Sequence, residues 1–191
     1  MLNGSAARWL LHGLRLRAAD TQTTAAERAC LARHAAGRLR LVEIGVMHGV
    51  TTAVLRAAMS EAGVLTAIDP HPPGRLGVSF ERAIARRELA AVPRGRLVLE
   101  RKRSADALAG WSGPIDFLFV DGDHSWSGID ADWRGWTPFV APGGIVALHD
   151  SRPVPGRPAA DSVRYARDVV AGDPRFVTID SVDSLTVLQR R

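Results

Sequence analysis

The sequence has one cysteine, one lysine and one tyrosine among its 191 residues, and each shortage excludes a class of protein. Because Cys30 has no second cysteine to pair with, an internal disulfide and a cysteine-based metal cluster are excluded. No apolar run approaches the roughly 20 residues that span a bilayer, so we expect no membrane segment. A reducing, cytoplasmic location is the simplest interpretation of these absences.

The scarcity of lysine also bears on the basic character of the chain. The formal net charge is +5, yet Lys102 is the only lysine, and arginines alternate with acids, as in ERAIARRE at 81–88. A protein that binds nucleic acid usually gathers its positive charge on one face or along one helix. We therefore expect no nucleic-acid partner.

The lone tyrosine and the lone lysine exclude two further classes of α/β enzyme. A short-chain dehydrogenase needs a Tyr-x-x-x-Lys pair, but Val169 stands four residues after Tyr165. A phosphate-binding nucleoside triphosphatase needs Gly-Lys before a helix, whereas Lys102 follows Arg101.

Hydrophobic residues make up 46% of the chain, and they are arranged in alternating strand and helix patterns. This alternation predicts an α/β fold, in which a Rossmann-like, doubly wound and mostly parallel seven-stranded sheet ends in a C-terminal antiparallel hairpin. The predicted strands are 39–44, 64–69, 96–100, 115–121, 144–150, 176–180 and 184–189. The predicted helices are 25–36, 50–63, 79–90, 104–110, one around 129–136, and 160–171.

The first 22 residues differ from the rest of the chain. They contain no acid before Asp20 and mix arginines with tryptophan and leucines, a composition close to that of an organellar transit peptide. We interpret residues 1–22 as a helical segment that packs on the domain or covers its site as a lid. Residues 23–191 then form a single domain, whose first helix begins at a capping box of Thr24 and Glu27.

Parallel sheets of this kind bind ligands at the carboxyl ends of their strands, and three strand ends here have features of a nucleotide site. In VEIGVMHGVT (42–51), Gly45 permits a tight turn and Gly49 lets a helix begin against a ligand. Asp69 is placed to accept hydrogen bonds from both hydroxyls of a ribose. Ser104 and Ala105 follow the third strand, where the edge of an adenine would lie. Each feature, taken singly, also fits an ordinary turn or helix cap.

The stretch FVDGDHS (119–125) brings a buried strand to the same edge and ends it in charged groups. Asp121 and Asp150 end neighbouring strands about one strand spacing apart, and two converging carboxylates suit Mg²⁺ or Mn²⁺. His124 is a candidate general base, with capping of the next helix as the alternative. If the strand stays extended, His149 and Asp150 point to opposite faces and one of them reaches the site. His149 is then open to ligating a softer metal, bonding substrate or packing in the core.

The runs VEIGVMHGVTT, AIDP, DFLFVDGDHSWSGIDAD and APGGIVALHD resemble the class I S-adenosylmethionine-dependent methyltransferases. The last two runs are similar to the small-molecule family that includes macrocin-type sugar O-methyltransferases. The resemblance covers residues 39–150 and the terminal hairpin. It implies that Glu43, Gly45 and Gly49 surround the methionine part of the cofactor, with Asp121 beside it. It also implies that Asp69 binds the ribose, and Ser104 with Ala105 the adenine.

The resemblance further implies methyl transfer to an oxygen of a small molecule, such as a sugar or phenol, in natural-product biosynthesis. Asp121 and His124 correspond to a metal-binding acid and a base three residues later. The metal set would be Asp121, Asp150 and His149, although relatives usually have an acid or amide where His149 stands. A non-catalytic scaffold or regulatory protein that binds S-adenosylmethionine is the alternative. An apolar N-terminal helix often joins subunits in this class, so a homo-oligomer is expected through that segment.

Overall fold

The computed structural model describes residues 4–74, 77–156 and 160–191. Within them, seven strands form one sheet in the order β3-β2-β1-β4-β5-β7-β6. Strands β1 to β5 are parallel, whereas β7 runs antiparallel to both β5 and β6. The predicted fold class is confirmed. The strands are β1 (Arg40–Ile44), β2 (Val64–Ile68), β3 (Arg96–Glu100), β4 (Ile115–Val120), β5 (Val140–Leu148), β6 (Phe176–Val182) and β7 (Leu185–Arg190).

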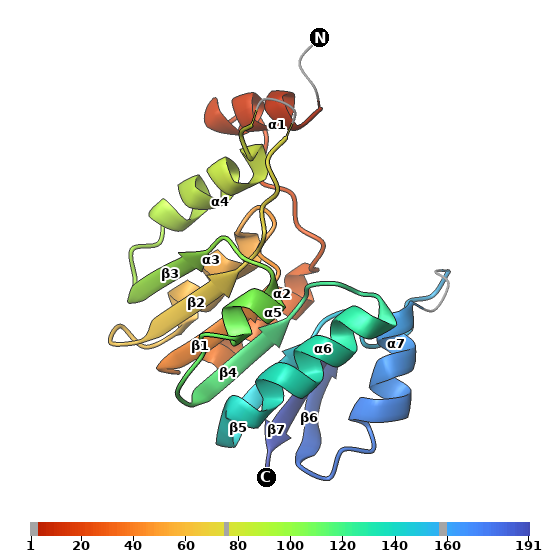
Figure 1. The fold of residues 1–191 in the computed structure, drawn as a ribbon. Helices are drawn as coiled ribbons and strands as arrows, with labels where there is room; N and C mark the ends of the chain where they lie inside the picture. The colour runs from red at the N-terminus through yellow and green to blue at the C-terminus, as the bar shows by residue number, and fades with distance from the viewer. Residues whose placement is uncertain (1–3, 75–76, 157–159) are drawn as a thin grey trace.

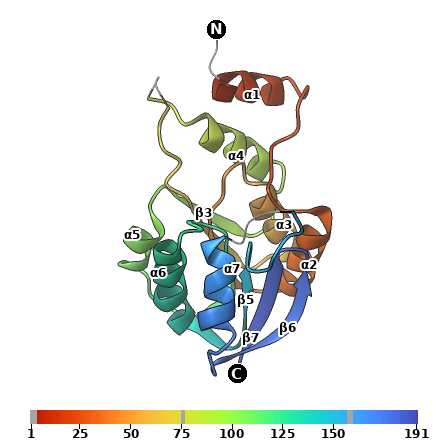
Figure 2. The ribbon, with the colours of Figure 1, turned by 90° about the vertical axis from the view of Figure 1, so that its right-hand side faces the viewer.

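Helices cover both faces of the sheet because alternate strand residues are apolar on both sides. Phe117 and Phe119 on β4 pack towards one group of helices, and Leu118 and Val120 pack towards the other. The first group is α2 (Ala25–Ala35), α3 (Val50–Ala58) and α4 (Phe80–Ala90). The second group is α5 (Ser104–Leu108), α6 (Trp126–Trp136) and α7 (Asp161–Tyr165), which the π-helical η2 (Ala166–Val170) continues (Figures 1 and 2).

The first helix, α1 (Gly4–Gly13), lies beside α4, away from the C-terminal hairpin (Figures 1 and 2). The ring centroids of Trp9 and Phe80 are 5.7 Å apart, and His12 Nε2 lies 3.3 Å from Glu88 Oε1. In the described part of the chain, none of the helices combines the length and the apolar character that crossing a membrane requires.

Side-chain caps account for the starts of two helices next to the site. Thr24 and Glu27 form the predicted capping box at the start of α2. Ser125 caps α6, because its hydroxyl accepts a hydrogen bond from the amide of Gly128. The alternative role of His124, as the cap of this helix, is therefore wrong.

Strand β5 differs from its predicted range at both ends. It begins at Val140, directly after the short helix η1 (Thr137–Phe139), because Val140 pairs with Ile115 before a shift in register at Phe117. It ends at Leu148, two residues earlier than predicted. The strand therefore stops before His149 and Asp150, and this early end decides how both side chains are directed.

The strand order reverses between β1 and β4, which is where open α/β sheets bind ligands. Backbone hydrogen bonds extend the parallel pairing one residue beyond the strands. The amide of Gly45 donates to Ile68 at 2.9 Å, that of Asp121 to Ile44 at 2.8 Å, and that of His149 to Val120 at 3.1 Å. Gly45, Asp121 and His149 consequently lie in a row across the carboxyl edge of the sheet.

Candidate active site

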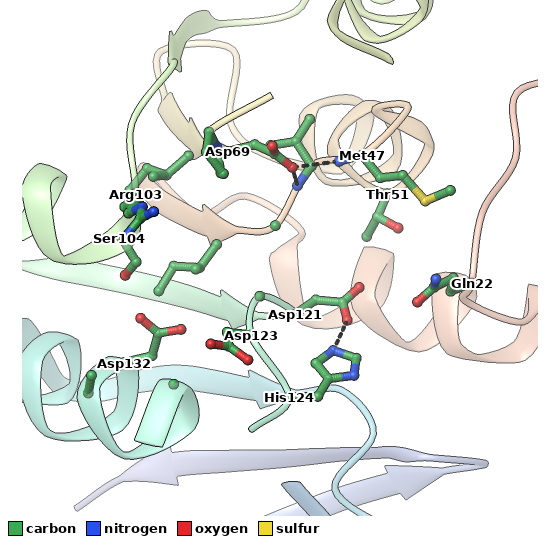
Figure 3. A pocket seen from close by; sticks show the side chains of 18 of the residues that line it. Gln22, Met47, Thr51, Asp69, Arg103, Ser104, Asp121, Asp123, His124 and Asp132 are labelled. Carbon is green, nitrogen blue, oxygen red and sulfur yellow. Dashed lines mark hydrogen bonds and ion pairs between the residues drawn. The ribbon is translucent and has the colours of Figure 1, made fainter. Parts of the chain in front are cut away.

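A cavity of about 820 Å³ opens at this edge, which is large enough for a cofactor and part of a second ligand (Figure 3). Six of the predicted site residues line it: Gly45, Asp69, Ser104, Ala105, Asp121 and His124. The other four, Glu43, Gly49, His149 and Asp150, lie beneath or beside it and are not lining residues.

Gly45 begins the β1–α3 loop and lies directly against the backbone of Asp121, the residue after β4. Its φ is +90°, and a Cβ atom there would lie 2.0 Å from the carbonyl oxygen of Asp121. Any side chain would therefore force the two strand ends apart. Gly49, the N-cap of α3, also has a left-handed φ, of +78°, and a Cβ atom there would lie 3.2 Å from the Cα of Ala85 in α4.

Asp69 holds this loop in place through its carboxylate. Oδ2 accepts hydrogen bonds from the amides of Val46 and Met47, both at 2.9 Å, and Oδ1 accepts one from the amide of His71 at 2.7 Å (Figure 3 labels Asp69 and Met47). A carboxylate has about four acceptor positions, so one remains on Oδ1. The sequence predicted bonds to both ribose hydroxyls, and this arrangement leaves room for one.

Glu43 lies below the cavity, because it points from β1 into the packed interior. Its exposed fraction is 0%, and burial raises its pKa to about 8. Burial thus favours its uncharged form, and neither of its carboxylate oxygens has a hydrogen-bond partner among the described residues. Glu43 does not line the cavity, and its place beside the methionine part of the cofactor stays a prediction.

A second wall of the cavity is formed by the start of α5 and by α6. Ser104 and Ala105 line it, and the hydroxyl of Ser104 accepts a hydrogen bond from Trp136 Nε1 at 2.7 Å. Asp132 lines it too, and burial raises its pKa. Sequence reasoning missed Asp132, although an acid three residues after the buried Ile129 was a signal that it lies near the apolar face of α6.

The segment before α2 forms a third wall; the sequence predicted a packing or lid segment over residues 1–22 but indicated none of its residues as lining the cavity. Residues 20–22 line the cavity on the side nearest His124 (Figure 3 labels Gln22). The amide of Asp20 donates to His48 Nδ1 at 3.0 Å, which ties the segment to the start of α3. The hydroxyls of Thr23 and Thr51, 3.3 Å apart, make a second tie.

Both His149 and Asp150 reach the neighbourhood of Asp121, so the expectation that only one of them could do so is wrong. That expectation assumed an extended strand. The chain instead leaves β5 at Leu148, and Asp150 has a left-handed φ of 47° that turns its side chain back towards the site. His149 Nδ1 lies 2.9 Å from Asp121 Oδ1 and 3.6 Å from Asp150 Oδ2.

His124 completes a cluster of two acids and two imidazoles. Its Nε2 lies 3.3 Å from Asp121 Oδ1, as the dashed line in Figure 3 marks, and its Nδ1 lies 3.1 Å from Asp150 Oδ2. Asp121, His124 and His149 each offer one ligand atom, and these atoms lie within 4.8 Å of one another. The predicted catalytic and metal-binding residues are thus brought together.

The charges in the cluster stabilise one another. Hydrogen bonds to Asp121, and then to Asp150, raise the pKa of His124 to about 10. Burial would lower the pKa of His149, but Asp121, Asp150 and Glu27 outweigh it and raise the pKa to about 9. Burial would likewise raise the pKa of Asp121, yet bonds from both histidines leave it lowered.

Glu27 is the remaining member of the cluster, and it comes from α2. Its Oε2 lies 3.3 Å from His149 Nε2, on the side of the ring away from Asp121. Its exposed fraction is 1%. The sequence indicated Glu27 as a capping residue of α2 and gave no sign of its contact with His149, because the two are far apart in the chain.

Residues 42–151 match the family of proteins described as a methyltransferase domain. The O-methyltransferase TomG of Streptomyces achromogenes, involved in tomaymycin synthesis and solved with S-adenosylmethionine, is similar in structure, with a TM-score of 0.69. The two are 18% identical, over 100% of this chain and 91% of TomG. The Bacillus cereus O-methyltransferase in complex with SAH has a TM-score of 0.63 and 16% identity, over 100% of this chain and 92% of its own.

An rRNA methylase of Streptococcus thermophilus is also similar, with a TM-score of 0.60 and 13% identity, over 90% of this chain and 99% of its own. At these identities the solved structures show a shared fold. The family match covers more than half of the chain and confirms the resemblance found in the sequence. The chain belongs to the methyltransferase-domain family and is an S-adenosylmethionine-dependent methyltransferase.

Proposed function

We propose that the protein transfers the methyl group of S-adenosylmethionine to an oxygen of a small molecule. The observation that carries the proposal is the cluster of Asp121, His124, His149 and Asp150 at one end of a cavity whose other end has a glycine loop and Asp69. Oxygen methylation requires a hydroxyl that is deprotonated and held in line with the methyl group. The cluster supplies groups for both tasks.

We include a divalent cation in this proposal, held by Asp121, Asp150 and His149. His149 Nδ1 lies 2.9 Å from Asp121 Oδ1 and 3.6 Å from Asp150 Oδ2. Neighbouring ligands around an octahedral ion with bonds of about 2.1 Å are separated by roughly 3 Å, so both separations from Nδ1 are compatible with a shared ion. An imidazole suits Mn²⁺ better than Mg²⁺, which favours Mn²⁺ of the two predicted ions. A bound cation would lower the pKa of an acceptor hydroxyl.

His124 is the proposed general base. It lines the cavity, and its side chain is 33% exposed, so an acceptor can reach it. A base must be neutral, and the pKa of about 10 keeps His124 protonated as long as both carboxylates accept its hydrogen bonds. His124 would therefore work as a base at neutral pH when Asp121 and Asp150 bind the cation and no longer accept hydrogen bonds from His124.

The charge of the cavity favours a small, neutral or cationic acceptor over RNA. Five aspartates line the cavity, against one arginine and one histidine: Asp20, Asp69, Asp121, Asp123, Asp132, Arg103 and His124. Such a surface repels a phosphate backbone, whereas nucleic-acid sites gather positive charge.

The tomaymycin role given for TomG supports natural-product biosynthesis as the context. The single buried thiol of Cys30 fits the cytoplasm, which we propose as the location.

We further propose that residues 1–22 act as a unit apart from the domain of residues 23–191. Residues 20–22 would contact the acceptor, since they line the cavity next to His124. Leu10 on α1 and Leu14, just after its end, are exposed and would join two copies. Light scattering of the full chain and of a Leu10→Glu, Leu14→Glu variant tests this, and a monomeric wild type would contradict it.

The experiment that tests the function has two stages. Calorimetry with S-adenosylhomocysteine first measures cofactor binding. Radiolabelled S-adenosylmethionine is then incubated with phenols, sugars, carboxylic acids and ribosomal RNA, in excess EDTA or with added Mn²⁺ or Mg²⁺. We expect cofactor binding, labelling of a small hydroxylated acceptor, and a rate that EDTA lowers and Mn²⁺ restores.

Each stage has its own contrary outcome. Absence of cofactor binding would overturn the proposal as a whole. Labelling of RNA with no labelling of small acceptors would overturn the substrate class. Full turnover in EDTA by metal-stripped protein would remove the cation from the proposal and leave His124 as the catalytic group.

A further inference from the structure

We propose that Glu27 is a positioning residue for the metal site: it fixes the ring of His149 so that Nδ1 faces the cation. The inference rests on the proposed metal-assisted methyl transfer and adds to it a residue from outside the matched segment of residues 42–151. Glu27 would act through His149 and touch neither cofactor nor acceptor.

Helix capping does not account for the burial of Glu27. A capping-box glutamate needs one bond to the backbone of the capping residue, which the amide of Thr24 supplies here at 2.8 Å. Glu27 is instead 1% exposed, and Oε1 accepts hydrogen bonds from the amide and the hydroxyl of Ser184, at 2.9 and 2.7 Å. A carboxylate this deeply buried needs a charged or strongly donating partner, and His149 is the imidazole beside it.

The contacts of Glu27 determine which nitrogen of His149 is available. Nε2 lies 3.3 Å from Glu27 Oε2, and an ionised carboxylate can only accept, so Nε2 carries a hydrogen. Nδ1 faces the carboxylates of Asp121 and Asp150, at 2.9 and 3.6 Å, so it also carries a hydrogen in the metal-free protein, and this is the hydrogen that a cation between the two carboxylates would replace. A carboxylate that holds the far N–H of a metal-binding histidine fixes its tautomer and orientation and raises its basicity.

Two separate elements, helix α2 with its N-cap and the turn between β6 and β7, hold Glu27 in this position. Its backbone belongs to the first turn of α2, and Thr24 anchors one carboxylate oxygen. Ser184, in the turn between β6 and β7, anchors the other. Because both oxygens are fixed by groups outside the cluster, the carboxylate cannot follow His149 if the ring turns, and it therefore works as a rigid support.

The test measures binding of Mn²⁺ in the absence of cofactor and acceptor. Protein stripped with EDTA is titrated with Mn²⁺, and the free ion is followed by electron paramagnetic resonance, for wild type, Glu27→Gln and Thr24→Ala. Glutamine keeps the shape of Glu27 but loses its charge. Thr24→Ala removes the side-chain cap of α2 and keeps the amide that bonds Glu27, so it controls for loss of helix stability. We expect Glu27→Gln to weaken Mn²⁺ binding by about 10–100-fold and Thr24→Ala to change it by less than about 2-fold.

A second measurement on the wild type does not depend on the variant folding. Nitrogen-15 spectra of histidine-labelled protein with Zn²⁺ report which ring nitrogen binds the ion. We expect Nδ1 of His149 to shift on binding and Nε2 to stay protonated.

Wild-type affinity in a folded Glu27→Gln variant, or binding through Nε2, would overturn the inference and leave metal-assisted transfer intact. Failure of the wild type to bind Mn²⁺ or Zn²⁺ at all would overturn the cation in the proposed function, and the role of Glu27 with it.

Discussion

The two ends of the cavity are built in different ways. At the cofactor end, the β1–α3 loop is shaped by backbone amides, which bond to Asp69, and by the close approach of Gly45 to Asp121. At the catalytic end, charged side chains contact one another. One comes from α2, and the others come from the residues that follow β4 and β5. The first end depends on the path of the chain, and the second on ionised groups that must stay matched.

This difference predicts how each end responds to change. Fewer ionisable side chains hold the cofactor end than the catalytic end, so we expect its shape to depend less on pH. The catalytic cluster has two imidazoles between three carboxylates, and loss of any one group leaves another buried without its partner. Mutations at the two ends should therefore separate cofactor affinity from turnover and stability.

The largest effect is expected from His124→Ala, which tests the catalytic end directly. If His124 is the base, turnover should fall by about 10²–10⁴, because no other imidazole in the described residues lines the cavity. Cofactor affinity should stay within a few-fold. The measurement is the single-turnover rate with the acceptor found above, together with calorimetry. Unchanged turnover would show that proton removal lies elsewhere.

His149→Ala should mainly affect stability. The side chain of His149 is 2% exposed, and its removal leaves the carboxylate of Glu27 buried without its imidazole partner. Removal of one member of a buried ion pair costs about 3–5 kcal/mol. Urea unfolding of metal-free protein measures the change. A double variant, His149→Ala with Glu27→Gln, should recover part of the loss, and no recovery would mean that packing and not charge is responsible.

Much of the cofactor end could be predicted from the sequence because its signals are local. Gly45 and Asp69 each follow a strand directly, and Ser104 begins the helix that comes after β3. A strand end is readable from an apolar run that stops at a turn residue. The fold followed from the same alternation. These features depend on neighbours a few residues away, and the cavity brought them together as expected.

The catalytic end was predicted only in part, because its contacts are long-range. Glu27 and His149 are 122 residues apart, and no sequence pattern around either residue indicates that the two are in contact. The side chains of His149 and Asp150 both reach Asp121 because β5 ends at Leu148 and Asp150 has a positive φ, which is rare outside glycine. Asp132 was missed since its own helix reads as an ordinary amphipathic one.

Asp69→Ala tests the opposite end and should have a smaller effect. The variant loses the acceptor for a ribose hydroxyl and frees the amides of Val46 and Met47. We expect cofactor affinity to weaken by about 1–3 kcal/mol, the range for leaving buried donors unpaired. Turnover at saturating cofactor should change little, since no group of the catalytic cluster is touched. A fall in turnover larger than the fall in affinity would contradict the separation of the two ends.

The smallest effect concerns pH and isolates one group of the cluster. Bonds to Asp121 and Asp150 raise the pKa of His124 from its ordinary value of 6.5 to about 10. A raised pKa means that the folded metal-free protein holds a proton that the unfolded chain releases. The stabilisation from His124 is therefore complete below about pH 6.5 and is lost as pH rises towards 10. Because the side chain is 33% exposed, water screens the interaction and the loss should be about 1 kcal/mol or less.

Urea unfolding in EDTA between pH 6.5 and 10 measures this loss of stability, with His124→Gln as the control. The difference between wild type and control should shrink with rising pH, whereas a constant difference would mean that His124 is held by packing and not by its charge.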